Sequence, residues 1–296
     1  MNYIDVCKEN RSSSYKKSIE AARKALSSLS FNRLPARHSP QPIDKNPKHV
    51  SEYSREIIQN LKQEELLYEA EKDFMKHQPD ITSSSRAILI NWLVSVHRYL
   101  KLLLETFYIT VSLVDRYLQK KSVTKYQIQL LGISALFLAA KYEEIYPPEF
   151  SKYLKVCENA YTKAQIVLME KEILKTLDFK LTVPTPWVFY QKFSESASLH
   201  RVEHNLGQYL IELTTLDINM LRYRSSLKAA SAVLISQKQF KKDSVWRLQQ
   251  ITGYAESELK ECIHDMMATL QLARFNPLKA IREKYSSQDY DSVSVN

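Results

Sequence analysis

Two short patterns in the sequence contain residue types that could do chemistry. His200-Arg-Val-Glu-His204 fits the H-x-x-E-H pattern, in which two histidines one helical turn apart hold zinc and the glutamate activates a water molecule. Only three of its positions are fixed and its surroundings are polar, so the solvated start of a helix is the favoured interpretation. Glu143 and Glu144 are adjacent carboxylates that point to different sides of a helix, which makes a poor acid/base pair.

The glycine content excludes the usual loops that bind nucleotides. The chain has three glycines, at Gly132, Gly207 and Gly253. A dinucleotide-binding G-x-G-x-x-G needs three glycines within six residues, and a phosphate-binding G-x-x-x-x-G-K-[ST] needs two, so neither is present. The H-R-D and D-F-G motifs of protein kinases are also missing from the sequence. We therefore predict that the chain is not itself a protein kinase, and we expect no metal and no cofactor.

Composition and charge predict an intracellular, soluble protein that binds neither membranes nor nucleic acid. The 296 residues are 44% hydrophobic and 25% charged, with a net charge of +9. Residues 1–50 hold ten Lys and Arg against four Asp and Glu, so this segment carries +6 and the remainder only +3. The three cysteines form no C-x-x-C pair, and the longest apolar stretch, 132–140, is too short to span a membrane.

The elements that must position any functional residue are predicted to be helices throughout. Residues 1–48 are rich in proline and basic residues, which predicts a disordered tail, and 289–296 read as a polar tail. Thr82 is expected to cap a helix, with Ser85 three residues later. Val183-Pro-Thr-Pro186 marks the best internal boundary. Apolar periodicity predicts helices near residues 51–71, 85–100, 105–118, 127–142, 148–156, 162–177, 186–196, 202–216, 226–236, 244–250 and 255–275.

An internal similarity suggests that one helical unit occurs twice. Residues 133–141 (ISALFLAAK) resemble residues 230–238 (ASAVLISQK), and each segment lies in the third helix of its half. Two copies of a unit of about a hundred residues would explain the similarity. Coincidence between two buried, alanine-rich helices would explain it equally well.

Several motifs, in order, resemble those of the cyclin family. Residues 85–97 (SRAILINWLVSVH) are similar to the cyclin-box motif M-R-A-I-L-V-D-W-L-V-E-V-H. Residues 129–149 resemble the family's third helix and its exit, and residues 169–179 resemble its fifth helix. Residues 76–82 (KHQPDIT) and the region 251–285 are similar to the mitotic A/B-type branch.

The resemblance implies an all-α fold with two tandem five-helix domains. We expect an N-terminal helix and connector at 49–81, a first cyclin box at 82–182, a second at 183–276 and a C-terminal extension at 277–296. The implied function is that of a non-catalytic subunit that binds and activates a cyclin-dependent protein kinase, in the nucleus and cytoplasm, at the G2/M transition. A cyclin-fold transcription factor that binds promoter DNA and polymerase machinery is the alternative.

The resemblance also assigns roles to individual residues. Lys141 and Glu170 match the family pair that contacts the kinase, and further interface positions are matched by Leu138, Tyr142, Glu143, Glu144 and Phe179. Arg86 and Asp115 match a buried ion pair that joins the first two helices of the box. Its loss would strand a buried charge.

A docking patch and two degrons are implied in the same way. The patch for Arg-x-Leu motifs in substrates or inhibitors is matched by Ile88, Leu89, Trp92 and Gln129. Ser95 stands where the family has glutamate, which removes a partner for the arginine of the motif. In the tail, Lys8-Glu9-Asn10 resembles a KEN degron read by the ubiquitin ligase of mitotic exit, and Arg23-Lys-Ala-Leu26 resembles the start of a destruction box.

Overall fold

Every regular element of the structure is helical in the residues it describes. The structure is a computed structural model that describes residues 53–68, 74–240 and 245–295. The predicted all-α fold is therefore confirmed, and residues 57–296 form one compact unit. The predicted tail motifs, Lys8-Glu9-Asn10 and Arg23 to Leu26, lie outside the described residues.

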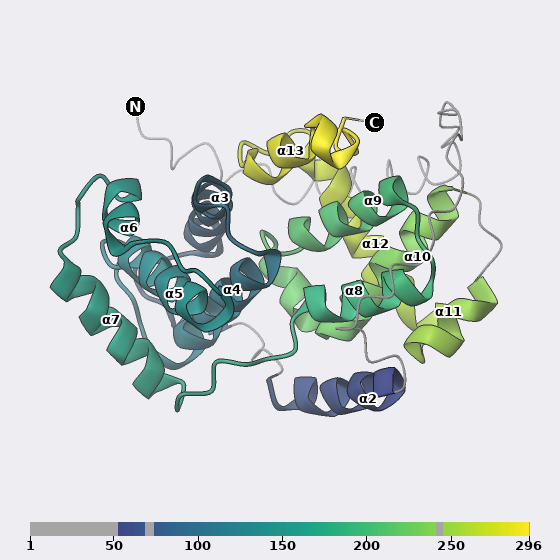
Figure 1. The fold of residues 1–296 in the computed structure, drawn as a ribbon, viewed down its shortest axis with the longest axis horizontal. Helices are drawn as coiled ribbons and strands as arrows, with labels where there is room; N and C mark the ends of the chain where they lie inside the picture. Colours follow the sequence, from purple (N-terminus) through teal and green to yellow (C-terminus); the bar gives the residue numbers. More distant parts are fainter. Residues whose placement is uncertain (1–52, 69–73, 241–244, 296) are drawn as a thin grey trace. The chain divides into compact units, whose positions relative to one another are not determined.

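The helices fall into two successive groups of five. After α2 (Ser54–Glu65), the first group comprises α3 (Ser83–Leu100), α4 (Leu104–Lys120), α5 (Ile128–Glu143), α6 (Phe150–Val156) and α7 (Lys163–Thr176). The second comprises α8 (Pro186–Ser196), α9 (Arg201–Leu213), α10 (Ser225–Gln239), α11 (Val245–Thr252) and α12 (Glu256–Ala273), and α13 (Ala280–Tyr285) follows. Short 3-10 turns are η3 (Leu66–Tyr68), η4 (Phe74–His77), η5 (Ile218–Arg222) and η6 (Gln288–Tyr290). In Figure 1 the helices α3 to α7 lie to the left and the helices α8 to α12 lie to the right.

Local sequence signals set where several helices begin. Thr82 caps α3 as predicted, because its hydroxyl accepts from the Ser85 amide while the Ser85 hydroxyl accepts from the Thr82 amide. Thr185 caps α8 in front of Pro186, whose fixed φ suits the first helical position. The predicted proline boundary therefore coincides with a well-defined helix start.

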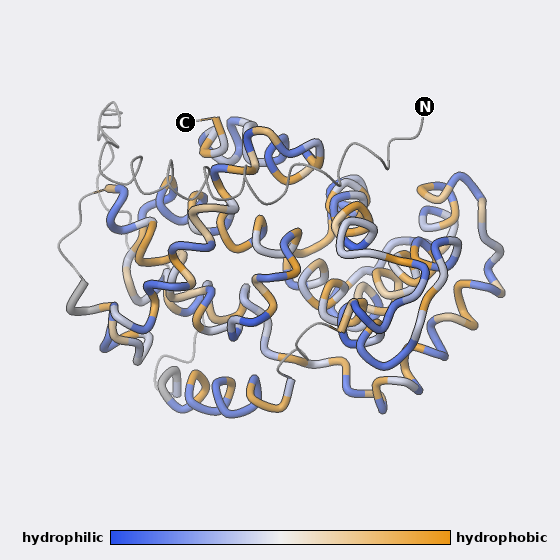
Figure 2. The backbone as a smooth tube through the Cα atoms, turned by 180° about the vertical axis from the view of Figure 1, so that it is seen from behind, coloured by the Kyte–Doolittle hydropathy of each residue, from blue (hydrophilic) through white to orange (hydrophobic). Residues whose placement is uncertain are grey.

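The two similar segments occupy the central helices of the two groups. Helix α5 packs against α3, α4 and α7, and α10 packs against α8, α9, α11 and α12. Both segments are almost wholly buried, which explains why apolar residues cover nearly all sides of α5. Figure 2 shows that helices nearer the surface alternate between apolar and polar residues. The internal similarity thus reflects two copies of one helical architecture.

Each glycine has a distinct structural reason. A side chain at Gly132 would meet Leu89 Cδ1 at 2.7 Å, so this glycine lets α3 and α5 approach closely. Gly207, which the sequence left unexplained, has Tyr190 Cε2 at 2.7 Å from the position of a Cβ atom, so α9 passes directly over that ring. Gly253 adopts the predicted positive φ, +72°, after α11.

The end of the chain is not the polar tail that the sequence predicted. Val293 and Ser294 are buried, and the Ser294 hydroxyl donates to the Arg282 carbonyl at 2.7 Å. The Asn205 amide donates to Asp291 Oδ2 at 2.7 Å, which ties this segment to α9. Polar residues of 289–295 therefore bind other parts of the protein instead of facing solvent. Such contacts between distant residues cannot be read from composition.

One buried arginine joins both groups of helices. Arg86 of α3 is fully buried, and its Nε and Nη2 donate to Asp115 of α4 at 2.6 and 2.7 Å. Its Nη1 donates to the Thr215 carbonyl, after α9, at 2.9 Å. A second link across the groups runs from the Thr185 hydroxyl to Glu105 at 2.9 Å, and burial raises the pKa of that carboxyl to about 7. The orientation of the two groups of helices therefore depends on these buried hydrogen bonds between them.

We expect Arg86→Ala to lower the free energy of unfolding by about 3–5 kcal/mol, because it leaves the Asp115 carboxylate buried without its partner. Denaturant unfolding followed by circular dichroism measures this. Arg201→Ala is the matched control, because Arg201 forms an exposed ion pair with Asp291 and should cost less than about 1 kcal/mol. Equal stability of the Arg86→Ala variant and the wild type would contradict the role assigned to this arginine.

Candidate functional site

Lys141 and Glu170 form an ion pair between the last turn of α5 and the middle of α7. The Glu170 side chain is largely buried, whereas the Lys141 side chain remains 41% exposed. The ammonium also lies 4.5 Å from the centre of the Phe137 ring, a cation–π contact that fixes its position further. The arrangement holds a positively charged donor in place at the surface, where it can bind the carbonyl groups of another protein.

The two carboxylates that follow Lys141, those of Glu143 and Glu144, have different hydrogen-bonding partners. Glu144 Oε1 accepts from the Leu103 amide at 2.7 Å and from the Thr106 hydroxyl at 2.6 Å, so this side chain ties the exit of α5 to the start of α4. Glu143 is half-buried, and its pKa is raised by burial and by the neighbouring Glu144. Of the two carboxylates, Glu143 is therefore the one that can accept hydrogen bonds from another protein.

Exposed apolar side chains surround the exits of α5 and α7. Tyr142 and Phe179 are exposed, and Tyr142 bonds to Thr182 through its hydroxyl, which brings the two helix exits together. The sequence reasoning missed two further exposed apolar residues just beyond α5, Ile145 and Tyr146, and a third, Leu168, within α7. Tyr146 is 90% exposed. The signal that could have found it is an apolar pair, Ile145-Tyr146, placed beyond the helix end and directly before two prolines.

Leu138 does not lie on this surface. It is 5% exposed and belongs to the hydrophobic core of the first group. Because its side chain is buried in the core, a direct contact with a partner, as the resemblance implied, is not available to it. Its contribution is to hold α5, and with it Lys141, against the core.

The four residues of the implied docking patch separate into exposed and buried positions. Ile88 is 59% exposed, and Trp92 and Gln129 are half-buried. Leu89 is buried, because the missing side chain of Gly132 makes room for it between α3 and α5. Gln129 accepts a hydrogen bond from the Tyr161 hydroxyl at 3.2 Å. The residues of the patch that remain accessible to a partner are thus Ile88, Trp92 and Gln129. Leu89 is part of the core beneath them.

The H-x-x-E-H segment serves the start of α9. The Glu203 carboxylate accepts from the His200 amide at 2.8 Å, which closes a capping arrangement. His204 packs against the rings of Trp187 and Tyr190, and burial lowers its pKa. Within the described ranges, no three His, Cys, Asp or Glu side chains come together as a metal site requires. The favoured interpretation of this segment as a helix start is therefore supported by its contacts.

No helix of the described residues has the length and apolar character needed to cross a bilayer.

Comparison with protein families gives matches along most of the chain. The family "Cyclin, N-terminal domain" matches residues 56–182, and the family "Cyclin, C-terminal domain" matches residues 184–296. The border between the two matches falls in the Val183-Pro-Thr-Pro186 segment that precedes α8.

Curated relatives are of the B and A types. The chain is 40% identical over 254 residues to cyclin-B2 of Bos taurus, covering 84% of this chain and 63% of that protein. It is 37% identical to cyclin-B of Marthasterias glacialis, covering 92% of this chain and 70% of that protein, and 39% identical to cyclin-A1 of Xenopus laevis, covering 83% and 59%. The first relative, cyclin-B of Dictyostelium discoideum, is 36% identical, and the chain spans 58% of its length.

Solved structures share the fold at low sequence identity. A viral cyclin from herpesvirus saimiri superposes with a TM-score of 0.64 at 20% identity, covering 72% of this chain and 96% of that one. A chain of the yeast RNA polymerase II CTD kinase complex CTDK-1 gives a TM-score of 0.52 at 12% identity, covering 77% and 81%.

Proposed function

The chain belongs to the cyclin family, and from this premise we propose that it is the regulatory subunit of a cyclin-dependent protein kinase, which it binds and activates as a heterodimer. The observation that best supports the proposal is the Lys141–Glu170 ion pair, held at the surface beside the exposed apolar side chains of α5 and α7. Such a surface provides both a fixed charged donor and apolar area for a stable interface.

Activation requires no catalytic group on this chain. A protein kinase is active when its Lys–Glu ion pair is formed and its αC helix is correctly placed. A rigid partner that binds only this state shifts the kinase toward it by the difference between its affinities for the two states. A shift from 1:99 to 99:1 requires a preference of about 5.5 kcal/mol. The kinase also supplies the ATP site, which agrees with the lack of nucleotide-binding loops in this sequence.

The proposed roles of the surface residues follow from their contacts. Lys141 donates hydrogen bonds to kinase carbonyls, and Glu170 is a positioning residue that holds the ammonium. Tyr142 and Phe179 contribute exposed apolar area, together with Ile145, Tyr146 and Leu168. Glu143 accepts hydrogen bonds from the kinase, while Glu144 stabilises the exit of α5 from within this chain.

We expect Lys141→Ala to weaken binding to a cyclin-dependent kinase by at least about tenfold, because a charge-assisted hydrogen bond contributes about 1.5–3 kcal/mol. Calorimetric titration of the purified kinase measures the affinity. Lys238→Ala is the matched control, because Lys238 is the counterpart of Lys141 in α10 and forms its own ion pair with Glu256. The proposal fails if both variants bind the kinase as tightly as the wild type.

We also propose that Ile88, Trp92 and Gln129 bind Arg-x-Leu motifs of substrates or inhibitors. Ser95 is exposed and offers no carboxylate to the arginine of the motif, so the leucine contributes most of the affinity.

Ile88→Ala should therefore weaken the binding of an Arg-x-Leu peptide by about tenfold, through loss of buried apolar area. Fluorescence polarisation of a labelled peptide reports the change. Tyr99→Ala is the control, since Tyr99 is also on α3 and is equally exposed, at 59%. Unchanged affinity of the Ile88→Ala variant rules out a role in docking.

We propose further that the protein acts at the G2/M transition, in the nucleus and the cytoplasm, and is degraded at mitotic exit. Lys8-Glu9-Asn10 and the Arg23 to Leu26 segment are the proposed signals for the ubiquitin ligase. Deletion of residues 1–48 should prolong the lifetime of the tagged chain at mitotic exit and leave kinase activation intact, because the proposed kinase-binding residues lie elsewhere. Pulse-chase measurement in synchronised cells decides this, and an unchanged lifetime contradicts it.

A further inference from the structure

A cavity of about 340 Å³ lies where the two groups of helices meet. One face of α4 lines it, with Tyr108, Ser112, Asp115, Arg116 and Gln119 at helical spacing. The opposite boundary includes the 183–186 segment, residues after η5 and Lys228 of α10. None of the residues proposed to bind a kinase lines this cavity, so it is separate from that surface.

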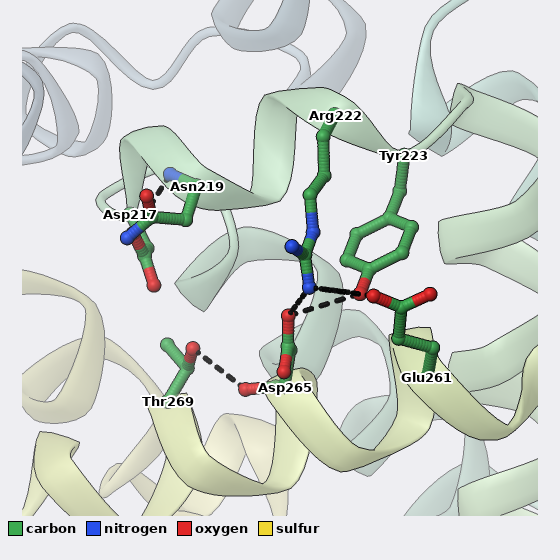
Figure 3. A network of polar contacts seen from close by, with 7 residues as sticks. All are labelled: Asp217, Asn219, Arg222, Tyr223, Glu261, Asp265 and Thr269. Atoms are coloured by element: carbon green, nitrogen blue, oxygen red, sulfur yellow. Dashed lines mark hydrogen bonds and ion pairs between the residues drawn. The ribbon is translucent and has the colours of Figure 1, made fainter.

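The cavity is positively charged. Five cationic side chains line it against two carboxylates, Glu65 and Asp115. Asp115 is neutralised by Arg86, whereas Glu65 accepts from the neutral amide and hydroxyl of Ser226 and keeps its negative charge. Arg222 is also engaged, and Figure 3 shows its guanidinium turned toward Asp265 and Glu261 of α12. Among the described residues, Arg116 and Lys228 form no ion pair, and Glu65 is the one lining carboxylate that does not pair with Arg86.

Lys228 is the clearest unpartnered group. The residue is 7% exposed, and in the described part of the chain its ammonium has neither a hydrogen-bond acceptor nor an ion-pair partner. Burial lowers the pKa of this ammonium, and electrostatic interactions with Cys262, Asp115 and Glu65 oppose the shift. An anion bound in the cavity would favour the charged form of this side chain over the neutral amine, which burial otherwise favours.

Two further donors in the same cavity lack acceptors among the described residues. Arg116 Nη1 is buried without a hydrogen-bond partner in that part of the chain, although the guanidinium lies over the Tyr68 ring at 4.9 Å. The buried Tyr108 hydroxyl likewise has no partner within the described ranges. Its electrostatic neighbours include Glu105 and Glu212, so an anion is less favourable beside Tyr108 than beside the cationic Arg116 and Lys228. All three unsatisfied groups can donate, which specifies a ligand that accepts hydrogen bonds.

We propose that this cavity binds a phosphate group through Arg116 and Lys228. Two cations with unused donors match a dianion with several acceptor oxygens better than they match a single neutral acceptor. The phosphate belongs either to a free small molecule or to a phosphorylated side chain of another protein, since both present the same chemistry. The site is independent of the proposed kinase surface.

The experiment compares the thermal midpoint and the calorimetric affinity of the full chain in inorganic phosphate and in chloride at equal ionic strength. Phosphate should raise the wild-type midpoint. Lys228→Met should raise the midpoint without phosphate, because it removes a buried charge, and should weaken phosphate binding by at least about tenfold. Arg116→Met should weaken phosphate binding similarly. Lys238→Met, an exposed site on the same helix, should leave phosphate binding unchanged.

Two outcomes overturn the proposal: a wild-type chain that responds equally to phosphate and chloride, or a Lys228→Met variant that binds phosphate as tightly as the wild type. A phosphothreonine peptide and its unphosphorylated form then distinguish the sources. Binding of the phosphopeptide more tightly than inorganic phosphate identifies a phosphorylated side chain, and the reverse order identifies a free phosphate. Because the assay uses the chain alone, its failure leaves the proposed kinase activation standing.

Discussion

The structure depends first on a single buried arginine. Arg86 binds Asp115 through two donors and the Thr215 carbonyl through a third, so one side chain joins α3, α4 and the segment after α9. A buried guanidinium is tolerated only when all of these bonds are made, because an unsatisfied charge in the interior is very costly. This requirement restricts the two groups of helices to the arrangement in which Thr215 reaches α3. Helix α5, packed on α3 and α4, takes its position from the same constraint.

The proposed function uses the rigidity that this arrangement provides. Lys141 is held by its ion pair with Glu170 and by the Phe137 ring, while Glu144 fixes the exit of α5 to α4. A surface held in this way loses little side-chain entropy on binding, so more of its interaction energy is available to favour one state of a partner. Under the proposed function, the protein acts by selecting one conformation of the kinase.

Local signals in the sequence predicted the helices well, because apolar periodicity and capping residues lie within the helix itself or directly before it. The Thr82 cap, the Pro186 helix start and the buried α5 helix are examples. Features that depend on distant parts of the chain were missed. Leu89 turns inward because Gly132 leaves room on another helix. Residues 291–294 fold back because the Asn205 amide donates to Asp291 and the Arg282 carbonyl accepts from Ser294. The cavity beside Lys228 could not be predicted from the sequence for the same reason, because its lining residues are more than a hundred positions apart in the chain.

The most direct test of the central claim is the activity of an isolated cyclin-dependent kinase, measured on a protein substrate while the purified full chain is added. The account predicts that phosphate transfer rises with the concentration of the chain and saturates when a one-to-one complex has formed. A kinase that binds the chain without any gain in activity, or an activity that is the same at every concentration of the chain, would contradict it.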